Sequence, residues 1–187
     1  MKTEHNLNQW GELFEKIDPV LHAINCVADC VDFETMSSYR SLKTAVMEHD
    51  KPLPGSIMGI HASHWVNIAL HANQLPEGPH KDLLSNHSGF DGISSFGPFA
   101  RCYICFPHLG IRLEVRPFDV CLLRGAALFH HMYRWSGDGR FVVVPFVDRH
   151  LFPTRRVKKP MNGIPIFGAK HKAFRGTYPA KPLPTFE

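Results

Sequence analysis

The chain has 187 residues, with 21 Lys and Arg against 17 Asp and Glu, and a formal net charge of +4. At about 150 residues per domain, this length predicts one domain with one hydrophobic core. With 44% hydrophobic and 20% charged residues, the composition excludes collagen-like, coiled-coil and strongly disordered chains. The 13 histidines are the unusual feature, because histidine is a common metal ligand and titrates near neutral pH.

Residues 1–50 are predicted to be helical. Apolar residues recur there at intervals of three and four, as on one face of a helix. These positions are Leu7, Trp10, Leu13, Phe14, Ile17, Leu21, Ile24 and Val27. Pro19 is expected to end one helix and start the next. The stretch KPLPGS at 51–56 breaks the pattern and is the best internal boundary.

Residues 56–150 are predicted to be rich in strands. Short segments of β-branched and aromatic residues alternate there with Gly, Pro and Asp turns. These segments are 63–70, 101–106, 111–116, 119–124, 128–135 and 140–147. The pattern predicts an α+β, mainly β domain, in which the N-terminal helices buttress an antiparallel sandwich or barrel. SGDG at 136–139 is expected to join the last two strands as a hairpin.

Residues 151–187 complete the predicted single domain, 1–187, as a basic, loop-rich segment. Its Lys and Arg residues fit either a solvated tail or a surface for phosphate groups. The five cysteines are an odd number, which favours reduced thiols inside a cell over a disulfide framework. The N-terminal residues are polar, and no apolar run is long enough to span a membrane. These features predict a soluble, intracellular protein with no membrane partner. Nucleus and cytoplasm are not distinguished.

Two histidines and one aspartate form a candidate metal site. His80 and Asp82 are two positions apart, so in an extended segment their side chains point the same way. His130 lies in a predicted strand much later in the chain and supplies a third ligand. Two His and one carboxylate leave open positions on an octahedral metal, a set typical of non-haem Fe(II) oxygenases. The neighbouring His131 faces the other side of its strand and stays open as the alternative to His130.

Arg140 is a candidate ligand for a carboxylate. If Trp135 paired with Arg140 across the predicted hairpin, His130 would lie about 16 Å from the arginine Cα. A five-carbon dicarboxylate together with an arginine side chain spans about that distance. Arg140, Val142 and Val144 are alternate residues of the predicted strand, so their side chains are expected on the same face. A planar guanidinium suits bidentate binding of a carboxylate, so the pattern predicts a site for 2-oxoglutarate.

The segments HKD, LRGAALFHH and GRFVVVPF resemble the His-x-Asp…His…Arg signature of Fe(II)/2-oxoglutarate-dependent dioxygenases. The stretch from GFDGISSF to LFHH is similar to fungal members near the ten-eleven-translocation and thymine-hydroxylase-like branch. Phe118-Asp119 stands where Gly-Asp is usual in that branch. The resemblance covers residues 63–148, about half the chain, and implies a double-stranded β-helix, a barrel of the jelly-roll or cupin type.

The resemblance also implies roles for individual residues. His80, Asp82 and His130 would hold Fe(II) as the catalytic centre, and Arg140 would bind the far carboxylate of 2-oxoglutarate. The spacing from Arg124 to His130 favours His130 over its neighbour. Such an enzyme uses O2 to hydroxylate its substrate and releases succinate and CO2.

Several alternatives stay open at this point. Asn67 and Tyr103 could hydrogen-bond the cosubstrate or serve only the fold, and Asp91 in GFDG is expected to be a turn residue. The substrate could be a small molecule, a protein or a modified nucleobase; oxidation of a base in a duplex would require base flipping and a basic groove. The competing functions are a non-catalytic or other-metal binding module on the same barrel, and a metal-dependent isomerase or hydrolase without 2-oxoglutarate.

Overall fold

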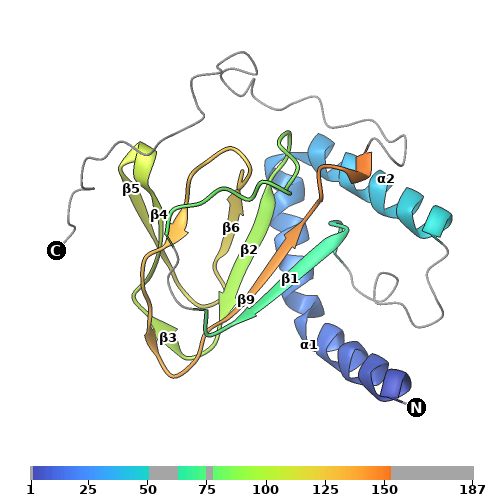
Figure 1. Cartoon of the computed structure of the whole chain (residues 1–187), viewed down its shortest axis with the longest axis horizontal. Coiled ribbons are helices and arrows are strands. Elements are labelled where there is room, and N and C mark those ends of the chain that lie inside the picture. The colour runs from blue at the N-terminus through green and yellow to red at the C-terminus, as the bar shows by residue number, and fades with distance from the viewer. Residues whose placement is uncertain (1, 51–62, 75–77, 153–187) are drawn as a thin grey trace.

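The computed structural model of the chain describes residues 2–50, 63–74 and 78–152, and has an α+β fold with antiparallel sheets (Figure 1). The helices are α1 (Lys2–Val31) and α2 (Phe33–Asp50). A four-stranded sheet has the order β1 (Asn67–Ala72), β9 (Phe141–Phe146), β2 (Asp91–Phe96), β6 (Val120–Leu123). A three-stranded sheet has the order β5 (Ile111–Val115), β4 (Cys102–Phe106), β7 (His131–Met132). The remaining elements are β3 (Phe99–Ala100), paired with β8 (Ser136–Gly137), and the 3-10 turn η2 (Pro107–Leu109).

The prediction of an α+β fold with antiparallel strands and N-terminal helices is confirmed. The helix-breaking stretch KPLPGS at 51–56 lies outside the described residues, and so do residues 153–187 of the predicted basic segment. All five cysteines carry free thiols. Within the described ranges, neither helix combines the length and the hydropathy that crossing a membrane requires.

The predicted helix break at Pro19 is wrong. Helix α1 continues through Pro19 to Val31, and the two helices are separated at Asp32. Asp32 caps α2, because its carboxylate accepts hydrogen bonds from the backbone N–H and the hydroxyl of Thr35 at 3.0 and 2.7 Å. A proline removes one helical hydrogen bond, but burial of the apolar face of α1 outweighs that loss.

Helix α1 covers one face of the four-stranded sheet (Figure 1). Phe14, Ile17 and Leu21 of α1 pack against Val143 of β9. Gly92 of β2 allows this close packing, since a Cβ there would lie 3.0 Å from Pro145 and closer still to a methyl group of α1. Among the residues of the predicted face whose burial is described, Leu13 and Val27 are exposed. The opposite face of the sheet is therefore left for a site.

The predicted hairpin at SGDG is also wrong. Ser136 and Gly137 form β8 and pair with β3, whereas β9 pairs with β1 and β2. The strand predicted at 128–135 is reduced to β7, which pairs with β4 in the other sheet. His130 thus directly precedes a strand of one sheet, and Arg140 directly precedes a strand of the other. Strand β2 was not predicted, because its sequence DGISSF contains glycine and serines rather than β-branched residues.

Candidate metal and carboxylate site

A cavity of about 540 Å³ lies between the two sheets, on the face of the four-stranded sheet opposite α1. Strands β1 and β9 contribute alternate residues to its wall, including Ala69, His71, Val142 and Val144. This alternation confirms the predicted parity of β9, since Arg140 lines the same cavity. A cavity of this size can hold a small organic molecule.

The backbone places the two predicted histidines side by side. His80 and His130 form an isolated antiparallel bridge, in which each backbone N–H donates to the carbonyl of the other residue at 3.0 Å. Residues paired in this way project their side chains from the same side of the ladder. The centroids of the two imidazole rings are 4.7 Å apart. Two residues that are distant in sequence therefore present their rings to one point at the cavity wall.

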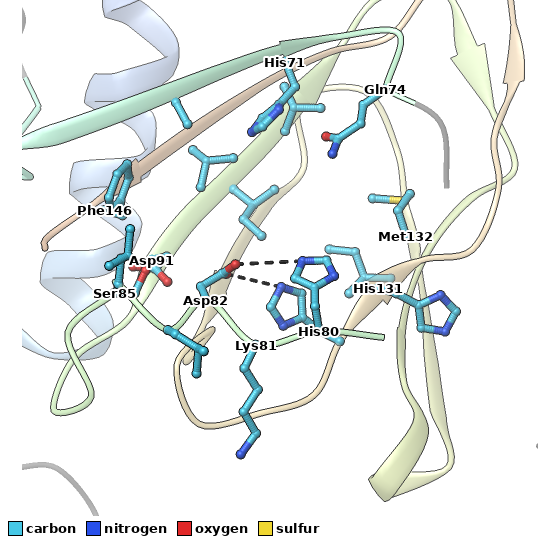
Figure 2. A pocket seen from close by; sticks show the side chains of 18 of the residues that line it. His71, Gln74, His80, Lys81, Asp82, Ser85, Asp91, His131, Met132 and Phe146 are labelled. Atoms are coloured by element: carbon cyan, nitrogen blue, oxygen red, sulfur yellow. Dashed lines mark ion pairs between the residues drawn. The ribbon is translucent and has the colours of Figure 1, made fainter. Parts of the chain in front are cut away.

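Asp82 completes this group. One carboxylate oxygen lies 3.8 Å from Nε2 of His80, and the other lies 3.3 Å from Nε2 of His130 (Figure 2). The backbone N–H of Asp82 donates to the carbonyl of Gly125 at 3.0 Å. A Cβ on Gly125 would overlap the Asp82 carboxylate, so a larger residue at that position would displace this side chain. The turn after Arg124 thus holds the carboxylate against the two rings.

The charges of this group are coupled. The hydrogen bond with His130 lowers the pKa of Asp82, even though partial burial acts in the other direction. Burial lowers the pKa of His130, but its hydrogen bonds with Asp82 and with the Leu128 carbonyl outweigh burial and raise that pKa overall. Protons therefore compete with any cation for His130 in mildly acidic solution.

The three side chains fit a divalent transition metal. Their ligand atoms all lie within 4.8 Å of one another. In each ring Nδ1 is hydrogen-bonded to a carbonyl at 3.0 Å, that of Gly78 for His80 and that of Leu128 for His130. This contact fixes Nδ1 as the protonated nitrogen of the neutral ring and leaves Nε2 to bind a metal. The donor set, two imidazoles and one carboxylate, suits Fe(II) and related ions.

Arg140 lines the same cavity and is only 3% exposed. One terminal nitrogen donates to Oγ of Ser95 at 3.0 Å, and the guanidinium lies 5.9 Å from the centroid of the Phe99 ring. Its Nε–H has no hydrogen-bond partner in the described part of the chain, and no Asp or Glu of that part forms an ion pair with it. Burial lowers the pKa of Arg140. A buried cation without an acid partner is costly, so an anionic ligand would be stabilising here.

The other predicted residues lie elsewhere. His131 lines the cavity wall, but its ring points away from Asp82 (Figure 2). Asn67 is outside the cavity lining, and its side-chain oxygen accepts a hydrogen bond from the backbone of Asp148 at 3.3 Å. Tyr103 is also outside the lining, and its ring contacts the guanidinium of Arg112 at 4.8 Å. The structure brings neither Asn67 nor Tyr103 to the cavity.

Sequence reasoning overlooked Asp91. This residue is not in a turn but is the first residue of β2, it is 3% exposed, and it lines the cavity near Asp82. Burial raises the pKa of Asp91 from 3.8 to about 7, while a hydrogen bond from Ser85 acts in the other direction. Strand alternation could have identified Asp91. Asp91 and Ile93 are two residues apart, so their side chains lie on the same face of the strand, and Ile93 also lines the cavity.

We expect Asp91→Asn to stabilise the metal-free protein at pH 8 but not at pH 4. In the wild type the folded state keeps the Asp91 proton between about pH 4 and 7 while the unfolded state releases it, so the free energy of unfolding falls as pH rises through this window. The gain in the variant has an upper limit of about 4 kcal/mol, for a shift of about three pKa units. Urea unfolding of both proteins with a chelator at pH 4, 6 and 8 measures it. A difference that is constant with pH would contradict this expectation.

No protein-family model matches the chain, and no curated protein is significantly similar to it in sequence. Among solved structures, the chain is similar to NgTET1 in complex with 5mC DNA, with a TM-score of 0.43 and 19% identity. The similarity covers 48% of this chain and 36% of that chain, so little more than a third of the length of NgTET1 is matched. This similarity is too low to assign the chain to a family, and the site has to be judged by its own residues.

Proposed function

We propose that the protein is an Fe(II)- and 2-oxoglutarate-dependent dioxygenase, with its two sheets forming a double-stranded β-helix. One observation carries the proposal: a close group of two His and one Asp lines the same cavity as a buried arginine that has no acid partner among the described residues. His80, Asp82 and His130 would be the metal ligands. Arg140 would bind the distal carboxylate of 2-oxoglutarate, with O2 as the second cosubstrate. The sequence resemblance to this class supports the same assignment.

Each side chain has a defined task in this proposal. When bound, the iron supplies the oxidative chemistry that hydroxylates a C–H bond and decarboxylates 2-oxoglutarate to succinate and CO2. His80 and His130 offer Nε2 because their Nδ1 atoms are held by carbonyls. Arg140 orients the dicarboxylate, and the apolar wall around Val142 and Val144 excludes water from that end of the cavity.

Binding of the two ligands by the whole protein tests the proposal most directly. Under anaerobic conditions we expect Fe(II) and 2-oxoglutarate together to produce a weak visible charge-transfer band, absent when either is omitted. In air, succinate release should then identify the substrate from a panel of metabolites, peptides and nucleic acids. Tight binding of another divalent metal with no band for 2-oxoglutarate would favour the alternative, a binding module that uses the same three ligands.

A further inference from the structure

The buried end of Arg140 is surrounded by neutral groups. Ser95 accepts a hydrogen bond from it, the centroid of the Phe99 ring lies 5.9 Å from it, and the Cys102 thiol is an electrostatic neighbour that acts on its pKa. Burial raises the pKa of the Cys102 thiol, although the neighbouring Arg140 acts in the other direction, so the thiol is neutral near pH 7. A carboxylate in any of these positions would neutralise the guanidinium. Hydroxyl and thiol groups instead accept hydrogen bonds and leave the positive charge available.

Strand register explains the place of Ser95. Ser95 of β2 pairs with Val142 of β9, which lines the cavity two residues after Arg140. Side chains of paired residues project from the same face, so the Ser95 hydroxyl lies on the cavity side of the sheet, next to the guanidinium. Ser94 projects to the opposite face; it is 1% exposed, and its hydroxyl has no partner among the described residues.

The thiol belongs to a short chain of contacts. Cys102 is fully buried on β4, and its Sγ–H donates to Sδ of Met132 on β7 at 3.1 Å. With its hydrogen directed to Met132, the thiol presents sulfur lone pairs to Arg140. Met132 itself lines the cavity. Ser95 and Cys102 are therefore neighbours of the guanidinium on strands of two different sheets, and its Nε–H has no partner among the described residues.

We propose that Ser95 and Cys102 are positioning residues, which fix the plane of the Arg140 guanidinium so that its unpaired donors face the distal carboxylate of the cosubstrate. This inference rests on the proposed function and adds the residues that set selectivity for a dicarboxylate. Without them the arginine side chain can rotate, and ordering it again on binding weakens affinity for that carboxylate alone.

The test compares two ligands that differ only at that end. The full-length protein is loaded anaerobically with Fe(II), and Kd is measured for 2-oxoglutarate and for 2-oxopentanoate, which has five carbons and lacks the distal carboxylate. We expect Ser95→Ala and Cys102→Ala each to raise Kd for 2-oxoglutarate about three- to tenfold, the effect of losing about one ordinary hydrogen bond. Kd for 2-oxopentanoate and for Fe(II) should stay unchanged. Ser94→Ala, an equal truncation on the other face of β2, should leave all three constants unchanged.

Cys102→Ser and Ser95→Thr keep an acceptor at each position and should restore most of the selectivity, which separates positioning from a packing defect. An equal loss for both ligands, or wild-type selectivity in the two alanine variants, would overturn the inference. A different result addresses the proposed function: if the wild type itself binds 2-oxoglutarate no more tightly than 2-oxopentanoate, Arg140 does not recognise the carboxylate and both proposals fail.

Discussion

Replacing His130 by alanine is expected to lower the affinity for Fe(II) by more than about 100-fold and to abolish 2-oxoglutarate turnover. Loss of an outer partner of a metal ligand alone commonly costs about 10- to 100-fold, so loss of a ligand should exceed that range. His130 is 7% exposed, and its Nε2 lies 3.3 Å from the Asp82 carboxylate. Anaerobic titration with Fe(II) measures the affinity, and succinate release measures the turnover.

His131→Ala is the matched control, because the two histidines are adjacent and both line the cavity. Their directions differ, since the ring of His131 points away from Asp82 (Figure 2). We expect Fe(II) affinity to stay within about threefold of the wild type, as for most substitutions away from a special contact. Loss of metal binding in His131→Ala together with retention in His130→Ala would show that the other histidine of the pair is the ligand.

The candidate metal group could be predicted from the sequence because it depends on local rules. An i, i+2 spacing in an extended segment puts His80 and Asp82 on one side, and parity separates His130 from His131. The sequence did not reveal the reason that His80 reaches His130. That reason is a single backbone bridge between segments far apart in the chain, with no regular strand of its own at His80.

Arg140 shows the difference between parity and pairing. The parity argument for Arg140, Val142 and Val144 needed only the alternation of one strand, and it is confirmed. The pairing argument needed the partner of that strand, and it failed, because β9 pairs with β1 and β2 rather than with the strand of His131. Which strands pair with one another depends on contacts throughout the hydrophobic core. A short stretch of sequence does not contain those contacts.

The same limit explains the errors elsewhere. At Pro19 the local tendency of proline to end a helix was outweighed by burial of the apolar face of α1 against the sheet. Asp91 lies in a segment with glycines, a pattern typical of turns, yet it starts β2, one of the two inner strands of its sheet. Buried polar residues such as Asp91 and Ser95 break the apolar pattern by which strands are predicted. Buried polar residues at or beside a cavity are therefore the ones that apolar sequence patterns do not reveal.

Replacing Arg140 by methionine is expected to weaken 2-oxoglutarate binding by about 100-fold or more while leaving the protein at least as stable. Truncating one side of a buried, hydrogen-bonded charge pair commonly costs about 2–5 kcal/mol of binding free energy. The effect on folding should be opposite, because Arg140 is 3% exposed and no described Asp or Glu neutralises it in the free protein. Methionine fills a similar volume without burying a charge, so the free energy of unfolding should be unchanged or raised by about 1 kcal/mol.

The two measurements together separate a binding role from a structural one. If Arg140 mainly supports the fold, the methionine variant should unfold at lower urea concentration, and affinity for Fe(II) should fall with it. If Arg140 is the carboxylate ligand, Fe(II) affinity and stability persist while 2-oxoglutarate affinity and succinate release are lost. Metal-dependent activity that survives in the variant without 2-oxoglutarate would instead favour an isomerase or hydrolase. A stable, metal-binding protein that no longer binds the dicarboxylate is therefore the outcome that the unpaired, buried guanidinium predicts.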